Sequence, residues 1–257
     1  MPPVAFRRNS GYTPAMASRR HPRHVTRIGL TALLLALGPE PAIAADPTNS
    51  SVDWELVPTI VARIEAPRIP DRVFPVSDAD GASAGLTDAR PAIQAAIAEA
   101  TNAGGGRVVL SPGVWRSHGP VHLADRIELH LERGAHLLFS PEASHYLPVV
   151  ETRWEGTRVH GYSPLIYARD VEDVAITGSG TIDGNVASEF HRWHGLAEPD
   201  MLRLRRMGFT GVPVNERVFG EGTHLRPPLI QFVRARRVLL DGFTAINSPF
   251  WVNHLVY

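Results

Sequence analysis

The chain has 257 residues, equal numbers of basic and acidic side chains, and no cysteine. This length suits one or two domains, and the lack of cysteine excludes disulfides and thiolate metal sites. Residues 1–44 have the pattern of a signal peptide, with six arginines before an apolar stretch at 28–37 and a small-residue cleavage site at Ala42-Ile43-Ala44. The apolar stretch is shorter than the roughly 20 residues that span a bilayer. We therefore expect an exported protein, periplasmic or secreted, with no membrane span after cleavage.

Cleavage after Ala44 changes the charge balance. It removes six arginines and Glu40 and leaves 20 basic and 25 acidic residues, a net charge of about −5 with histidine neutral. Nucleic-acid binding rests on a net positive surface. The charge therefore argues against nucleic acid as a partner and leaves neutral or weakly acidic partners open.

Residues 45–73 are rich in proline and weakly patterned, and we expect a lead-in segment there, before the main domain at 74–257. Asp78 and Asp80 follow in an acidic stretch. Alternating aspartates resemble the start of a calcium loop, but the later ligands of such a loop are missing. A plain turn is the favoured interpretation.

One helix is predicted after this turn. Asp88 is placed to cap it, and Pro91 falls in its first turn, where proline is tolerated. Apolar residues recur at helical spacing and form one narrow stripe: Ile93, Ala96, Ile97 and Ala100. Gly104 to Gly106 end the helix in a tight helix-to-strand turn, since a phosphate-binding loop would precede its helix.

Short apolar segments separated by turn residues follow the glycines. Five candidate strands stand at even spacing, at 107–110, 114–117, 121–123, 127–131 and 136–139. Such spacing suits a β-sandwich, a barrel or a β-helix.

An internal repeat favours the β-helix over the other two folds. The segment at 165–183 reappears at 229–247 with an offset of 64 residues. The matched positions are Leu165-Ile166, Val174, Ile176, Gly178 and Ile182 with Leu229-Ile230, Val238, Leu240, Gly242 and Ile246. Recurrence of the same strands and turns in the same order is typical of stacked coils. We therefore predict an all-β fold, a parallel β-helix, in which the helix after Asp88 caps the open first coil.

Residues 187–226 interrupt the repeat and are predicted to form an insertion on one face of the coils. Its basic cluster, Arg203, Arg205 and Arg206, suits either bidentate pairing with sugar carboxylates or a solvated surface. His191 and His194 have the spacing of metal ligands only if they are helical, and no third ligand is near in sequence. We expect no metal and no cofactor.

No residue pattern in the chain identifies an acid–base pair. A G-x-S-x-G elbow is missing, as is a cysteine nucleophile. Glycoside hydrolysis with inversion needs two carboxyl groups about 6.5 to 9.5 Å apart. Asp183 and Asp241 are the nearest candidates, but both stand at glycine-flanked turn positions. Aspartate is common at such positions because its side chain hydrogen-bonds to the backbone. The segment at 247–254 mixes aromatic and polar residues, which suits either stacking on a sugar ring or packing inside the coils.

Together these motifs resemble glycoside hydrolase family 28, the polygalacturonase family, over about residues 60–257. The markers lie, in chain order, at 78–81, 87–88, 92–94, 104–106, 112–113, 131–135, 176–184, 226–227 and 247–251. The most specific part is the run at 178–184, G-S-G-T-I-D-G, followed by Arg226-Pro227 and by Asn247-Ser248-Pro249-Phe250-Trp251. The resemblance implies a right-handed parallel β-helix and inverting hydrolysis of α-galacturonide bonds in pectin without a metal.

The catalytic residues that the resemblance implies do not occur in this chain. In the family they lie in N-T-D-G-I-D, D-D, G-H-G and R-I-K motifs after the N-S-P-F-W strand, and none is present here. We therefore expect the N-terminal portion of such an enzyme, truncated at the C-terminal end of the coils and inactive alone. Stacking would place 251–257 one coil before the first catalytic motif. Trp251, Asn253 and His254 are thus predicted to bind the substrate, a pectic polysaccharide or oligogalacturonide.

Two other interpretations stay open. One is a non-catalytic β-helix that binds polysaccharide or persists as a fragment. The other is a polysaccharide lyase, which shares the fold but needs a calcium-binding carboxylate cluster and an arginine base, and the sequence shows no such cluster. Because terminal coils normally need a cap, we also predict self-association through 251–257.

Overall fold

The structure is a computed structural model that describes residues 54–78 and 81–257. The predicted signal peptide at 1–44 and the first part of the lead-in segment lie outside the described residues. Helix α1 (Leu56–Val61) lies in the rest of the lead-in, and none of its residues is buried. In the two described ranges, no helix is both long and apolar enough to cross a membrane.

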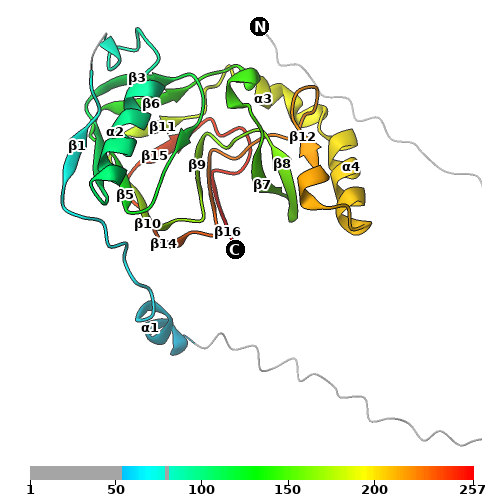
Figure 1. The fold of residues 1–257 in the computed structure, drawn as a ribbon, viewed down its shortest axis with the longest axis horizontal. Coiled ribbons are helices and arrows are strands. Elements are labelled where there is room, and N and C mark those ends of the chain that lie inside the picture. Colours follow the sequence, from blue (N-terminus) through cyan, green and yellow to red (C-terminus); the bar gives the residue numbers. More distant parts are fainter. Residues whose placement is uncertain (1–53, 79–80) are drawn as a thin grey trace, which may run out of the picture. The chain divides into compact units, whose positions relative to one another are not determined.

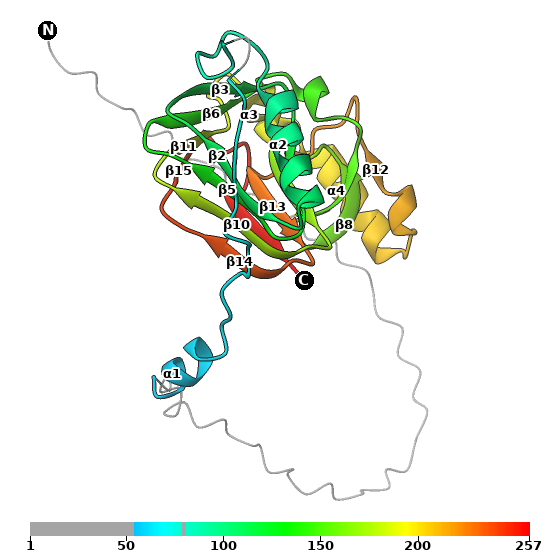
Figure 2. The same ribbon diagram turned by 60° about the vertical axis from the view of Figure 1, so that its left-hand side comes forward.

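Parallel strands form three sheets through which the chain passes in turn (Figure 1). Sheet A holds β1 (Val73–Pro75), β2 (Gly106–Leu110), β5 (Ile127–Leu131), β10 (Glu172–Gly178) and β14 (Arg236–Leu240). Sheet B holds β3 (Gly113–Ser117), β6 (Ala135–Phe139), β11 (Thr181–Asp183) and β15 (Thr244–Ile246). Sheet C holds β4 (Val121–His122), β9 (Ile166–Arg169), β13 (Ile230–Val233) and β16 (Asn253–Val256). From β2 onward, each pass through A, B and C adds one strand to each sheet, and Figure 2 shows the sheet A strands following one another. These stacked coils are the parallel β-helix architecture that the repeat predicts.

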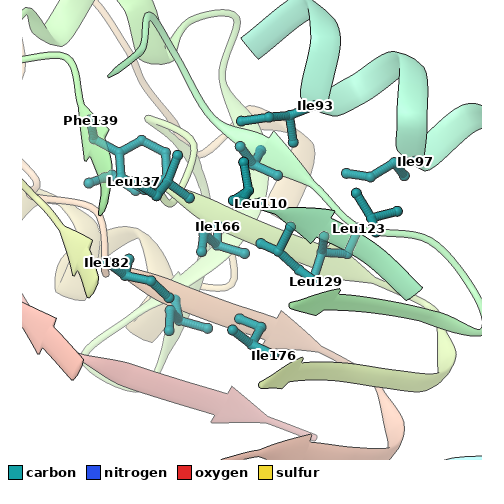
Figure 3. Packing of buried hydrophobic residues seen from close by; sticks show 14 of the residues in the cluster. Ile93, Ile97, Leu110, Leu123, Leu129, Leu137, Phe139, Ile166, Ile176 and Ile182 are labelled. Carbon is teal, nitrogen blue, oxygen red and sulfur yellow. The ribbon is translucent and has the colours of Figure 1, made fainter. Parts of the chain in front are cut away.

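Side chains inside the coils stack in apolar columns. Val108, Leu129 and Ile176 stand in register across sheet A and are fully buried. Figure 3 shows Leu129 and Ile176 in this interior together with Ile182 of sheet B. Neighbouring strands in a sheet lie about 4.8 Å apart, so each column packs the apolar side chain of one coil against that of the next.

Helix α2 (Arg90–Asn102) packs on the first coil. Its buried residues are those of the predicted stripe, and Figure 3 shows Ile93 and Ile97 pointing from α2 into the core. The residue that caps the helix is Ala89, one position later than predicted. Asp88 still serves the start of the helix, because its Oδ1 accepts hydrogen bonds from the backbone N–H groups of Arg90 at 3.0 Å and His118 at 2.9 Å.

The internal repeat corresponds to the last two coils, with one correction. Strands β9 and β13 pair with the predicted offset of 64 residues, as between Ile166 and Ile230. In sheet B the offset is 63, and Ile182 pairs with Ala245 instead of Ile246. The turn that leads into β15 is one residue shorter than the turn that leads into β11. Ile246 is therefore 39% exposed, whereas Ile182 is buried in the core.

Ion pairs join the same two coils at the turn between sheets C and A. Arg234 donates to Asp170 at 2.5 and 2.9 Å, and Arg237 donates to Asp173 at 2.5 and 2.9 Å. The two residues of each pair are 64 positions apart in the sequence, and all four residues have a positive φ. They therefore occupy equivalent turn positions of two coils and carry opposite charges. The Arg237 hydrogen bonds and the backbone N–H of Arg68 hold the pKa of Asp173 at about 2, against the opposing effect of burial.

Two segments leave the coils and pack together beside sheet C (Figure 1). One is an antiparallel hairpin that the strand pattern does not predict, β7 (Val150–Trp154) and β8 (Thr157–Gly161). The other, the predicted insertion, holds α3 (Glu189–Arg192), α4 (Glu198–Phe209) and β12 (Val218–Phe219), which pairs with β8. Short 3-10 helices lie at Ala143–Tyr146, Trp193–Gly195 and Val214–Glu216. The two segments share a second hydrophobic cluster: Trp154, Val159, Leu204, Phe219 and Leu225.

The turn after β10 requires glycine, which gives a test of the stacking. Gly178 has a φ of +104°, and a Cβ at this position would collide with the carbonyl oxygen of Leu131 in the preceding coil. We expect Gly178→Ala to lower the free energy of unfolding by more than about 2 kcal/mol. Gly222 also has positive φ but no atom near its missing Cβ, so Gly222→Ala should cost only about 1 kcal/mol. Equal losses for the two variants in urea denaturation would contradict the close packing of the coils.

Self-association through the last coil stays a prediction, and the strand edges of that coil provide a test of it. In the part of the chain that the structure describes, β14, β15 and β16 pair on one side only. Exposed edges with apolar side chains favour edge-to-edge pairing, and Leu255 of β16 is 53% exposed. Sedimentation velocity should show concentration-dependent association that Leu255→Lys reduces. Leu202→Lys, at an equally exposed leucine of α4, should leave it unchanged, and a monomer at all concentrations would refute the prediction.

Candidate functional site

The outer face of sheet C carries a column of polar side chains. His122, Tyr167, Gln231 and His254 occupy equivalent positions in β4, β9, β13 and β16. The residues that precede the first three belong to the hydrophobic core. Because side chains alternate between the two faces of a strand, the polar column lies on the side of the sheet that faces away from the coil interior.

Strand β7 covers the middle of this column. The Tyr167 hydroxyl donates a hydrogen bond of 2.6 Å to the Glu151 carbonyl oxygen, and the Thr152 hydroxyl donates to Gln231 Oε1. Gln231 is fully buried, and burial raises the pKa of the Tyr167 phenol to about 12. The hairpin thus encloses Tyr167 and Gln231 and fixes their side chains.

His254 stands at the end of the column in the last coil. Its side chain is mostly buried, and its Nδ1 lies 2.7 Å from the Gln231 Nε2. Burial, followed by the charge of Arg153 on β7, lowers the pKa of His254 to about 4. A histidine with this pKa is neutral at ordinary pH and acts through hydrogen bonds rather than charge.

Three aromatic rings stack beside this histidine. Trp154 of the hairpin lies parallel to Phe250 at 5.3 Å between ring centroids, and Phe250 lies parallel to Trp251 at 4.8 Å. Trp251 meets the His254 ring edge-on at 4.1 Å and is 39% exposed. The stack therefore anchors Trp251 through Phe250 to the second hydrophobic cluster and leaves part of its indole open to solvent.

Arg226 packs against the Phe250 ring of the aromatic stack. Its guanidinium lies over the Phe250 ring at 5.1 Å and donates a 2.9 Å hydrogen bond from Nη1 to the Pro249 carbonyl oxygen. Burial lowers the pKa of the Arg226 guanidinium. Its Nε and the indole Nε1 of Trp154 are buried and have no partner among the described residues. The motif that contains Arg226-Pro227 thus holds the Asn247–Trp251 segment against sheet C.

The structure brings two of the three predicted substrate-binding residues together. Trp251 and His254 are in ring contact. Asn253 pairs in register with Ile230, whose side chain lies in the core. It therefore lies on the opposite face of β16 from His254, at the exposed end of an interior column, and does not join the other two.

The two aspartates considered for acid–base chemistry lie on different sheets. Asp183 is in β11 of sheet B, where its Oδ2 lies 3.0 Å from His136 Nε2. Its Oδ1 accepts hydrogen bonds from the Asn185 backbone at 2.8 Å and from Asn247 Nδ2 at 2.9 Å. These bonds link neighbouring coils and occupy both carboxylate oxygens of Asp183. Asp241 lies elsewhere, directly after β14 of sheet A.

A buried carboxylate, Glu151, lies next to the column but is fully engaged. Arg158 donates to it at 2.5 and 3.1 Å, and Arg169 and Arg234 lie 2.9 and 3.5 Å from its oxygens. Burial acts to raise the pKa of this carboxyl, but the hydrogen bonds from Arg158 and the three positive charges outweigh it and lower the pKa. Glu151 is therefore ionised and fixes the hairpin on sheet C, a structural role.

A second polar cluster lies in an open pocket of about 560 Å³ on the outer face of sheet A. Arg107 Nε donates to Glu128 at 2.8 Å, and Thr177 donates to the other oxygen of the same carboxylate. His130 Nδ1 lies 2.7 Å from the Thr177 hydroxyl. These bonds join the neighbouring strands β2, β5 and β10 on the outer face of sheet A.

Three of the insertion residues singled out in the sequence, Arg203, Arg205 and His191, have local partners. Arg203 pairs with Asp200 at 3.3 Å and lies over the Phe219 ring at 4.1 Å, and Arg205 pairs with Glu155 at 2.8 Å. His191 Nε2 lies 3.1 Å from the Asn185 carbonyl oxygen, and His194 is exposed. No group of three or more potential metal ligands lies together in the described ranges. Asp78 accepts a 2.5 Å hydrogen bond from the Ser83 backbone, as a turn residue does, and Asp80 lies outside the described residues.

Sequence reasoning missed Tyr167, Gln231, Thr152 and Trp154. A signal for the first two was present, because Tyr167 and Gln231 directly follow Leu165-Ile166 and Leu229-Ile230 of the repeat and so share one column. The other two lie on the hairpin, and only the folded structure shows that β7 covers sheet C.

The solved structures that are similar to this chain include two exopolygalacturonases. An exopolygalacturonase from Thermotoga maritima, described as hyperthermoactive, shares 41% sequence identity over 77% of this chain and 46% of that protein, with a TM-score of 0.73. A family 28 exopolygalacturonase from Yersinia enterocolitica shares 25% identity over 70% of this chain and 35% of that protein, with a TM-score of 0.50. No protein-family model and no curated protein sequence matches the chain.

These similarities confirm the resemblance to glycoside hydrolase family 28 that the sequence motifs indicate. The chain spans about half the length of the Thermotoga maritima protein and about a third of the Yersinia enterocolitica protein. It shares with them the fold built from parallel sheets.

The depressed pKa of His254 gives a pH dependence to stability. The folded pKa of about 4 lies below the ordinary value of 6.5, so the unfolded chain binds more protons between these two values. The free energy of unfolding therefore falls as the pH drops from 6.5 to 4. We expect His254→Gln to flatten this slope in urea denaturation at about pH 7 and about pH 4.5. The exposed-histidine variant His194→Gln should keep it, and an unchanged slope in His254→Gln would contradict the assignment.

Proposed function

We propose that this chain is part of an exported hydrolase that cleaves α-galacturonide bonds of pectin with inversion. The observation that carries the proposal is the pairing of a partly exposed Trp251 with His254 at the outer edge of sheet C, 4.1 Å between ring centroids. The 41% identity to the Thermotoga maritima exopolygalacturonase supports the substrate class. The family resemblance supports a right-handed sense for the coils.

The aromatic stack has the properties of a sugar platform. An aromatic face packs against the apolar face of a sugar ring, and polar neighbours supply hydrogen bonds to its hydroxyl groups. Trp251 has little freedom to lose on binding, because Phe250 and Trp154 already hold its ring. A sugar stacked on Trp251 would lie beside the His254 ring.

The position of the β7–β8 hairpin favours cleavage near the end of a pectin chain. Tyr167 and Gln231 lie beneath β7 and are buried, so a polymer cannot run along the column past them. A sugar chain would approach sheet C only from the side of His254 and Trp251. The Thermotoga maritima and Yersinia enterocolitica proteins both carry the name exopolygalacturonase, in keeping with this proposal.

We further propose that these 257 residues are inactive alone. They contain none of the family's catalytic motifs, and among residues 54–78 and 81–257 the site holds no pair of free carboxyl groups facing each other across a sugar-sized gap. Catalytic carboxyl groups would come from a further coil on the edges of β14, β15 and β16. The alternative is a chain that only binds polysaccharide. Binding without hydrolysis, in a longer homologue as well as in this chain, would favour that alternative.

Substitutions in a longer homologue that carries these residues test the proposal. Trp251→Ala and His254→Ala should each raise KM or lower kcat for polygalacturonate by about tenfold or more, because each removes a contact to the bound sugar. Trp54→Ala, at an exposed tryptophan of the lead-in, serves as the matched control and should leave both constants unchanged. The measurement is reducing-sugar release.

Two results would overturn the proposal. The first is unchanged kinetics for both site variants. The second is an unsaturated, ultraviolet-absorbing product that requires calcium, which is the signature of a lyase. Reducing-sugar release by the purified 257-residue chain itself, at a level above a mock preparation, would refute its proposed inactivity.

A further inference from the structure

The hydrogen-bonding roles of the Gln231 side chain are set by its neighbours. Its Oε1 accepts from the Thr152 hydroxyl, and its Nε2 donates at 3.4 Å to the Arg153 carbonyl oxygen, which can only accept. The same Nε2 lies 2.7 Å from Nδ1 of His254. An amide nitrogen has two N–H donors and no acceptor. The Nδ1 of His254 is therefore the acceptor and carries no proton.

This bond determines the tautomer of His254. A neutral imidazole has one protonated and one unprotonated nitrogen, so a proton-free Nδ1 places the proton on Nε2. Within the described ranges, Nε2 makes no hydrogen bond, and it is not one of the two fully buried side-chain atoms without a partner. It is therefore a donor that still reaches solvent, on a ring that touches Trp251.

A positive charge lies on the same side of sheet C. Arg153 has no carboxylate partner among the described residues, and its guanidinium lies 5.0 Å above the Tyr257 ring. Its charge also acts on His254, as the second cause after burial of the lowered pKa. The edge of the column thus offers a neutral donor and an unpaired cation, which match an anionic oxygen ligand.

We propose that Gln231, held by Thr152, is a positioning residue that fixes His254 as an Nε2–H donor, so that His254 and Arg153 receive the carboxylate of a uronic-acid residue stacked on Trp251. The binding of a uronic-acid carboxylate by His254 and Arg153 is the ligand half of this proposal, and it rests on the proposed function. The Nε2–H tautomer of His254 is the tautomer half, and it does not. Gln231 acts only through His254 and touches no sugar.

Nuclear magnetic resonance on the unliganded 257-residue chain tests the tautomer directly. With nitrogen-15 histidine, long-range proton–nitrogen spectra near neutral pH separate protonated from unprotonated ring nitrogens, and the His254 signals are those lost in His254→Gln. We expect a protonated Nε2 and an unprotonated Nδ1. A protonated Nδ1, or an even mixture of both forms, overturns the proposal.

Two glutamine variants show whether Gln231 sets the tautomer. The carboxylate of Gln231→Glu only accepts, so Nδ1 of His254 should become protonated. Gln94→Glu makes the same chemical change at a glutamine that bonds the backbone of His122 at 3.0 Å and not a histidine ring. It should leave His254 unchanged. An Nδ1 that stays unprotonated in Gln231→Glu overturns the positioning role.

Titration with trigalacturonate and with its fully methyl-esterified form tests the ligand. Trigalacturonate should shift the His254 Nε2 signal, and Arg153→Gln should weaken its binding about tenfold or more, because a charged contact is lost. The esterified form should bind weakly, with little effect of Arg153→Gln. Equal binding of both forms overturns the carboxylate assignment.

The two proposals fail in different ways. Absence of trigalacturonate binding with the expected tautomer counts against the proposed function and against the ligand half of this inference. Firm trigalacturonate binding with a protonated Nδ1 leaves the proposed function intact and overturns the role of Gln231.

Discussion

Hydrogen bonds between the parallel strands of successive coils keep equivalent residues side by side, and every other feature of the molecule depends on this register. It aligns Val108, Leu129 and Ile176 in one apolar column. It also sets oppositely charged turn residues against each other, as with Asp170 and Arg234. A one-residue shift would turn each strand over and place its apolar side chains in water. The shorter turn before β15 is tolerated because Ala245 takes the interior position that Ile182 holds in the coil before.

The same register creates the candidate site on the outer face. Because Tyr167, Gln231 and His254 are neighbours in one column, each residue can be held by the coil beneath it and by the hairpin above it. Gln231 is bonded to Thr152 of the hairpin on one side and to the His254 ring on the other. The hairpin also supplies the first ring of the aromatic stack. A rigid donor and a rigid aromatic face at the open end of the column are the preorganised elements that sugar recognition requires.

The sequence was sufficient to predict most of the fold. Apolar periodicity predicted α2 and its buried stripe, and the repeat predicted stacked coils, because both depend on local patterns. The β7–β8 hairpin escaped prediction because its contacts with sheet C join residues as far apart as Thr152 and Gln231. For the site, the prediction named Trp251 and His254, which lie in ring contact, and their binding of substrate stays a prediction. It placed Asn253 with them, although strand alternation from His254 assigns Asn253 to the other face.

Coil register brings Gln231 and His254 into direct contact beneath the hairpin. A double-mutant cycle with Gln231→Leu and His254→Leu, followed by urea denaturation, measures this contact most directly. Two hydrogen-bonded buried partners predict a coupling free energy of about 1 kcal/mol or more between the substitutions. Strictly additive losses of stability would contradict a direct contact between Gln231 and His254.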